Sequence, residues 1–110
     1  MSVYVDPITE HGGNRSFKWP RSCHLYADSP DELHAMAKAI GLRREWFQDR
    51  PDFPHYDLVP ARRVRAVALG AIEQEGWHAV EFAQRRRGAR MSGDLFEGVT
   101  SLMENLNLFG

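Results

Sequence analysis

The stretch that decides the fold is residues 23–34, CHLYADSPDELH, in which a strand passes into a helix. Cysteine, leucine and alanine alternate with His24 and Tyr26 over residues 22–27, and this period of two predicts a strand with one face in the core. His24 and Tyr26 share the opposite face. A buried polar face must have its hydrogen bonds satisfied, so we expect either a polar network or a binding site there.

A helix follows directly. Ser29 is a favourable N-cap, Pro30 suits the first helical position, and Glu32 stands where a capping box needs it. The helix ends at Gly41. After a loop with two prolines comes a short strand, HYDL, at residues 55–58. We expect this strand–helix–strand unit to be a βαβ crossover, whose two strands run parallel.

The rest of the chain completes a small α/β domain of order β-β-α-β-α-β. A first strand is predicted at residues 2–6, followed by a long loop at residues 7–21, and a second helix starts at Pro60 and ends near Leu69.

The last quarter of the chain is less clearly patterned. Residues 77–82 fit either a strand or a helix, and we favour a strand whose even-numbered residues share one face. The domain then spans residues 1–90. Residues 91–110 are predicted to form an appended amphipathic helix that packs on the domain or pairs with a second subunit.

Composition places the chain among ordinary globular domains. Its 110 residues, 43% of them hydrophobic, suffice for one modest core, and a formal net charge of -1 gives no general attraction to nucleic acid or membranes. Cys23 is the only cysteine, which excludes an internal disulfide and a thiolate metal cluster. The sequence shows no apolar run long enough to cross a bilayer and no signal peptide, so we expect a cytoplasmic protein without a membrane partner.

Several spaced motifs together resemble one family. They are VYVD at residues 3–6, CHLYAD at 23–28, ELHAMA at 32–37, IG at 40–41, WFQ at 46–48 and HYDL at 55–58. In this order they are similar to a family of short bacterial and phage proteins, domain of unknown function 4031. The resemblance covers residues 3–71; the loop at 7–21 is longer than the family pattern, and the tail at 91–110 lies outside it. The resemblance does not indicate an activity, a cofactor, a partner or catalytic residues, because none is established for the family.

Three carboxylates stand at or just past the carboxyl ends of predicted strands: Asp6, Asp28 and Asp57. If these strands are parallel neighbours, the carboxylates meet at one edge of the sheet and would hold Mg²⁺ or Mn²⁺. His24 and His55 would add nitrogen ligands or a general acid and base, and His55 shares a strand face with Asp57. The alternative is that the aspartates cap turns.

Arg62 and Arg63 lie in the first turn of the second predicted helix, where cations oppose the helix dipole. A phosphate bound at the helix N-terminus would explain them. The alternatives are a solvated arginine face or pairing with Glu73, Glu75 or the acidic tail. With Tyr26 on the polar strand face, these arginines are the candidate substrate-binding residues.

The leading hypothesis is therefore metal-assisted chemistry on a phosphate ester or nucleotide, with His24 and His55 as catalytic residues. One alternative is a non-enzymatic accessory protein of a phage or mobile element that binds a host protein. Residues 91–110 would then form the partner face or a homo-oligomer face. A further alternative is nucleic-acid binding through the arginines of residues 85–90.

Overall fold

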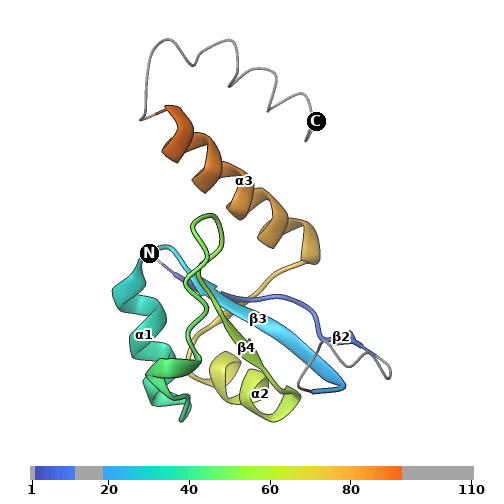
Figure 1. Ribbon diagram of the computed structural model, residues 1–110. Helices are drawn as coiled ribbons and strands as arrows, with labels where there is room; N and C mark the ends of the chain where they lie inside the picture. The colour runs from blue at the N-terminus through green and yellow to red at the C-terminus, as the bar shows by residue number, and fades with distance from the viewer. Residues whose placement is uncertain (1, 12–18, 93–110) are drawn as a thin grey trace.

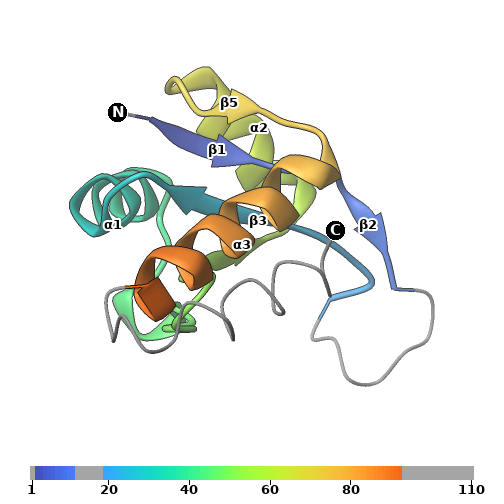
Figure 2. The ribbon, with the colours of Figure 1, turned by 90° about the horizontal axis from the view of Figure 1, so that it is seen from above.

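Three layers make up the fold in the computed structural model, which describes residues 2–11 and 19–92 of the chain. Helices α1 and α2 cover one face of a mixed sheet, and helix α3 crosses the other (Figure 1, Figure 2). In chain order the elements are β1 (Val3–Val5), β2 (Thr9–Glu10), β3 (Arg21–Ala27), α1 (Pro30–Ala39), the 3-10 helix η1 (Arg44–Trp46), β4 (Tyr56–Leu58), α2 (Pro60–Ala68), β5 (Ile72–Glu73) and α3 (Gly76–Ser92).

Strand β3 is the centre of the sheet. It is antiparallel to β1, with Tyr4 opposite Tyr26, and antiparallel to β4, with His24 opposite Asp57. Strand β2 pairs with the first residues of β3, and β5 runs parallel to β1. The predicted α/β class is confirmed, but the prediction that the strands before and after α1 are parallel is wrong.

The reason lies in the connection between β3 and β4. After α1 and η1, the chain runs back alongside α1 before it enters β4 (Figure 1). In this segment Gln48 pairs with His55 in an antiparallel bridge. The chain therefore re-enters the sheet at the end from which it left. A βαβ crossover occurs one step later: β4 and β5 both run in the direction of β1, and α2 connects them.

Residues 77–82 belong to helix α3, so the preference for a strand there is wrong. His78 and Phe82 face the sheet, with ring centroids 4.8 and 6.5 Å from that of Tyr4. Residues four apart share a side in a helix and in a strand alike, so these two fit both patterns. Val80 separates the patterns, because it would face inward in a strand and is 58% exposed in α3.

Two segments predicted from the sequence lie only partly within the residues that the structure describes. Of the loop at residues 7–21, the structure describes both ends, which contain β2 and the approach to β3. Of the tail at residues 91–110, only residues 91 and 92 are described, as the end of α3. The amphipathic helix predicted for the tail, and its proposed pairing, fall outside the described residues.

The main core lies between the sheet and the helices α1 and α2. Alternate strand residues enter it, as predicted, and they meet the apolar stripe of α1; the buried members are Val5, Cys23, Leu25, Ala27, Leu33, Ala37, Ile40, Leu42, Tyr56, Leu58, Ala66 and Ala71. Ser29 caps α1, because its hydroxyl accepts a hydrogen bond from the backbone N–H of Glu32. Gly41 ends the helix with a φ of 84°, as expected of a left-handed C-terminal residue.

Two leucines of opposite burial test this packing. Leu58 is fully buried on β4, and Leu69, at the end of α2, is 56% exposed. We expect Leu58→Ala to lower the free energy of unfolding by about 2–5 kcal/mol, because it leaves a cavity in the core. The same change at Leu69 should cost no more than about 0.5 kcal/mol. Urea unfolding followed by circular dichroism measures both, and equal losses would contradict the assigned core.

Candidate metal centre

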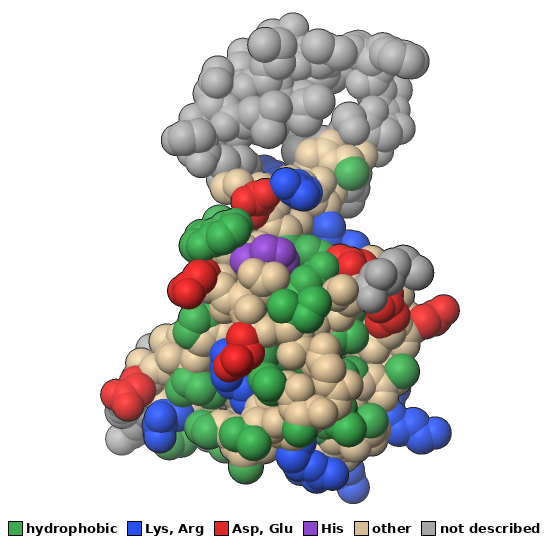
Figure 3. Space-filling view, turned by 180° about the vertical axis from the view of Figure 1, so that it is seen from behind, with side chains coloured by type: hydrophobic (Ala, Val, Ile, Leu, Met, Phe, Trp, Pro, Cys, Tyr) green, Lys and Arg blue, Asp and Glu red, His purple; other side chains and the backbone are tan. Residues whose placement is uncertain are grey.

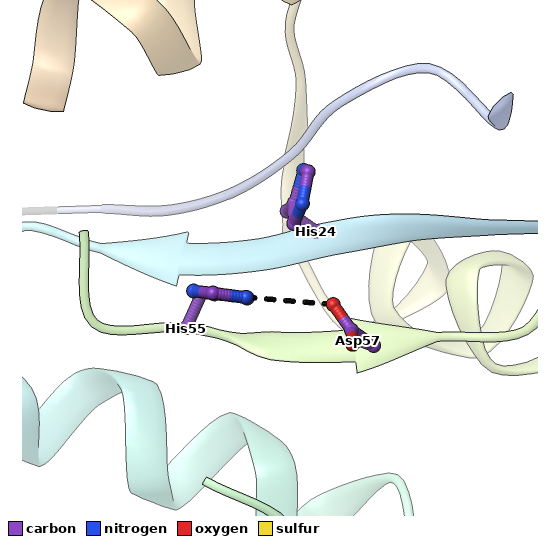
Figure 4. A group of neighbouring side chains, drawn as sticks. All are labelled: His24, His55 and Asp57. Carbon is purple, nitrogen blue, oxygen red and sulfur yellow. Dashed lines mark ion pairs between the residues drawn. The ribbon is translucent and has the colours of Figure 1, made fainter. Parts of the chain in front are cut away.

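His24, His55 and Asp57 come together on the face of the sheet that α3 crosses (Figure 4). His24 lies in β3 directly opposite Asp57 in β4, and His55 immediately precedes β4. One possible ligand atom from each residue lies within 4.8 Å of the others. The antiparallel pairing of β3 and β4 thus assembles two imidazoles and one carboxylate.

Asp6 fixes the orientation of the His24 ring. Its Oδ2 lies 2.6 Å from Nδ1 of His24, and its Oδ1 accepts a hydrogen bond of 2.6 Å from the backbone N–H of the same residue. Asp6 is only 7% exposed, so this carboxylate is almost fully enclosed. An ionised carboxylate can only accept, which places the proton on Nδ1 and leaves Nε2 of His24 as the other ring nitrogen.

His55 is oriented in the same way by the backbone. Its Nδ1 lies 2.7 Å from the carbonyl oxygen of Phe53. Because a carbonyl cannot donate, Nδ1 carries the hydrogen, and Nε2 faces Oδ1 of Asp57 at 3.5 Å. The second oxygen of Asp57 accepts a hydrogen bond of 2.5 Å from the side-chain amide of Gln48. Each of the three candidate ligands is therefore held by a partner of its own.

Aromatic rings surround the two histidines. The ring of Phe53 stacks on that of His55 with centroids 4.9 Å apart, and it meets the His24 ring edge-on at 5.3 Å. The two imidazoles are themselves 5.0 Å apart and nearly perpendicular. This packing limits the rotation of both imidazole rings.

The carboxylates of Asp6 and Asp57 set the protonation of His24. Burial lowers the pKa of His24, but the hydrogen bond to Asp6 and the two negative charges outweigh burial and raise it above the usual value. Burial also raises the pKa of Asp57, and here its contacts with the His55 ring and the Gln48 amide outweigh burial, so that the pKa falls below its usual value. Asp57 therefore stays ionised at neutral pH.

Asp28 does not join the other two aspartates. It lies at the end of β3 next to the start of β1, where it accepts hydrogen bonds from the backbone N–H of Ser2 and from the hydroxyl of Tyr4. The predicted meeting of three carboxylates required parallel strands. Because β1 and β3 are antiparallel, Asp6 and Asp28 stand at opposite ends of the pair.

Tyr26 is enclosed between the sheet and α3. Its side chain is fully buried, and its hydroxyl lies 2.8 Å from Nδ1 of His78. It packs against Phe53 at a centroid distance of 5.1 Å and against Phe82 at the same distance. Tyr26 therefore supports the aromatic wall behind the histidines, and the structure does not bring its hydroxyl to the candidate ligands.

Arg62 and Arg63 of α2 bind atoms of the protein itself. Arg62 donates a hydrogen bond of 2.5 Å to the carbonyl of Ile40 at the end of α1. Arg63 donates to the backbone carbonyl of Asp6 at 2.9 Å and pairs with Glu73 at 2.8 Å. The glutamate pairing considered for Arg63 is thus present, and Arg63 anchors the segment that carries Asp6.

Sequence reasoning missed Gln48 and Phe53. Gln48 was noted as part of a motif, but only the return of the chain beside α1 brings its amide to Asp57. Phe53 acts through its backbone carbonyl, and no side-chain pattern reports such a role. Cys23 faces the core, as predicted, and burial raises the pKa of its thiol to about 12. His34 bonds to the hydroxyl of Tyr56 at 2.9 Å.

The arginine run of residues 85–87 lies in α3, where consecutive residues point about 100° apart around the helix axis. Arg85 pairs with Glu81, and the guanidinium of Arg86 lies over the ring of Phe82. On the face of the molecule in Figure 3, basic and acidic side chains are interspersed. Among the described residues of α3, these contacts pair part of the positive charge with acidic and aromatic groups, and nucleic-acid binding through the run stays a prediction.

The family described as protein of unknown function, DUF4031, matches residues 3–86. The chain belongs to this family. The match reaches further than residues 3–71 and takes in most of α3 as well as every residue of the candidate centre. No curated protein and no solved structure matches the chain. Among the described helices, none combines the length and hydrophobicity that a membrane crossing requires.

The contact between Asp6 and His24 predicts a pH-dependent stability in the metal-free protein. The folded-state pKa of His24 is raised, so its contribution is complete below the unfolded value of about 6.5 and is lost as the pH rises through the folded pKa. Asp6→Asn should therefore cost more unfolding free energy near pH 5.5 than near pH 8.5.

The same variant allows a direct check by NMR titration of the ring protons. We expect the pKa of His24 to fall in Asp6→Asn, whereas that of His34, which burial and Arg44 lower, should stay where it is. An unchanged His24 titration would show that Asp6 does not control this ring.

Proposed function

We propose that the protein is a metal-dependent hydrolase of phosphate esters, with a divalent ion held by His24, His55 and Asp57. The observation that carries the proposal is the state of the two imidazoles. Each uses Nδ1 for a partner inside the protein, which leaves Nε2 for an ion. Histidines that bind metals almost always donate their other N–H to a carboxylate or a backbone carbonyl, and Asp6 and Phe53 supply these two acceptors.

The donor set narrows the choice of ion. Two imidazole nitrogens and one carboxylate oxygen suit Zn²⁺ or Mn²⁺ better than Mg²⁺, which prefers oxygen ligands and retained waters. Ligand atoms about 2.1 Å from a tetrahedral ion lie about 3.4 Å apart. Since the candidate ligand atoms lie within 4.8 Å of one another, binding requires them to close by at most about 1.4 Å.

Three protein ligands leave a coordination position for water, as in the catalytic sites of zinc hydrolases. A divalent ion held there would lower the pKa of such a water to about 7 and would supply hydroxide at neutral pH. The hydroxide oxygen would bond to phosphorus while the bond from phosphorus to the ester oxygen breaks. The ester oxygen would take up the proton that the water released, which would give an alcohol and inorganic phosphate. Asp6 and Gln48 keep His24 and Asp57 in place during these steps.

A phosphate ester is the substrate class that the neighbouring charge favours. Asp57 also lines a pocket to which Arg62 contributes. An anionic substrate can therefore meet a metal cation on one side and a guanidinium on the other, which stabilises the charge that develops on phosphoryl oxygens. The pocket that Arg62 shares with Asp57 supports Arg62 as a substrate-binding residue.

Metal binding can be measured by competition with a chromophoric chelator for Zn²⁺ and Mn²⁺. We expect His55→Ala and His24→Ala to weaken binding by more than about 100-fold, because each removes a ligand, and Asp6→Asn to weaken it by about 10- to 100-fold through its partner. His34→Ala is the matched control and should bind like the wild type. Equal affinities in all four variants would rule out this ligand set.

Hydrolysis of p-nitrophenyl phosphate provides the activity assay. Asp57→Asn should abolish metal-dependent turnover because it removes an ionised ligand, and chelation of the ion should do the same to the wild type. Asp28→Asn is the control, since Asp28 is also a predicted metal ligand but lies at the far end of β3. If Asp57→Asn kept full activity, or Asp28→Asn lost it, the centre would be wrongly placed.

A further inference from the structure

We infer that the pocket beside Asp57 binds the base of a nucleoside monophosphate whose phosphate reaches the metal centre; this inference rests on the proposed function. The residues that line the pocket are Trp19, Leu42, Trp46, Asp57, Val59 and Arg62. They combine two indoles and two aliphatic side chains with one carboxylate and one guanidinium. A phosphate alone would leave most of this apolar lining unused, whereas a nucleotide has a planar ring to place against it.

The apolar part of the pocket is built by segments that end or begin at one side of the sheet. Trp46 ends η1, Leu42 follows α1, and Val59 is the N-cap residue of α2. Leu42 is buried, and Trp46 packs partly against the main core, so this wall is anchored from behind. Stacking on indole rings tolerates any base, because every base has a π-face.

Arg62 is a fixed cation at the rim of the pocket. Its guanidinium donates to the carbonyl of Ile40, at the negative end of the α1 dipole. Gly41 makes this approach possible, because a Cβ there would lie 2.8 Å from the nearest guanidinium nitrogen. Only one of the five N–H groups of Arg62 makes this bond, and a planar guanidinium held in position is well suited to a phosphate.

Asp57 connects the pocket to the metal centre. Its carboxylate belongs to both, since it faces Nε2 of His55 and lines the pocket with Arg62. Without an ion, Asp57 and Arg62 balance each other's charge, and an anion gains little there. A divalent ion on Asp57 makes this end of the pocket positive, so metal and nucleotide should each increase the affinity of the protein for the other.

Tryptophan fluorescence can test the pocket, because two of the three tryptophans line it. The third, Trp77, is 62% exposed on α3, and Trp77→Phe removes its background. In this variant with saturating Zn²⁺ or Mn²⁺, AMP should quench the emission and bind at least about tenfold more tightly than ribose 5-phosphate. Removal of the metal should weaken AMP binding by a similar factor.

Substitutions in the pocket lining distinguish the contribution of the base to the affinity from that of the phosphate. Trp46→Phe and Trp19→Leu, followed by isothermal titration calorimetry, should each weaken AMP binding several-fold or more and leave the affinities for ribose 5-phosphate and for the metal unchanged. These two unchanged affinities also show that the variants are folded. Arg62→Gln should weaken both phosphates alike.

The outcomes distinguish this inference from the proposed function. If the metal binds but AMP and ribose 5-phosphate bind equally well, the nucleotide pocket is overturned and the metal centre stands. If neither tryptophan variant changes AMP affinity, the pocket is likewise overturned. If the wild type binds no Zn²⁺ or Mn²⁺, the proposed function fails first, and the metal-dependent nucleotide site fails with it.

Discussion

The hydrogen bonds between Asp6 and His24 are the contact on which the rest of the site depends. A carboxylate as enclosed as that of Asp6 is costly unless its oxygens are bonded, and both bonds come from one residue of the neighbouring strand. The pair extends the β1–β3 ladder by one step and selects the tautomer of the imidazole. Arg63 adds a third tie, because it holds the backbone carbonyl of Asp6 from α2. One polar cluster thus joins two strands and a helix, and it engages only one of the two ring nitrogens of His24.

The faces of the strands could be predicted from the sequence, whereas the directions of the strands could not. Alternation alone places His24 and Tyr26 opposite the core, and the same rule puts His55 and Asp57 on one side. Direction depends on whether the chain returns beside α1 before it forms β4, and residues 47–54 carry no periodic pattern that reports this return. The assumption of parallel strands is why Asp28 was included in the predicted site. In parallel strands the carboxyl ends lie side by side, whereas in the antiparallel pair of β1 and β3 they lie at opposite ends.

Tertiary packing also decided the features that the local pattern left ambiguous. The aromatic residues of 77–82 fit a helix or a strand, and the outcome depends on a sheet face rich in rings, which a helix covers with His78 and Phe82 one turn apart. The residues that position the candidate metal ligands could not be recognised from local sequence either. Gln48 acts through a contact set by the fold, and Phe53 acts through its backbone carbonyl, so residue type gave no indication of either role.

The position of β4 links the candidate metal centre to the stability of the sheet. This strand has three residues and, among the described strands, pairs with β3 alone. Two candidate ligands belong to β4 or directly precede it, and the third lies across the ladder in β3, so an ion held by all three cross-links the two strands. An ion that binds only the folded arrangement stabilises it by mass action, which would tighten β4 and fix the carboxylate that the pocket shares. The same ion would then supply the positive charge that a phosphate needs, and it would also hold Asp57 in place relative to Arg62.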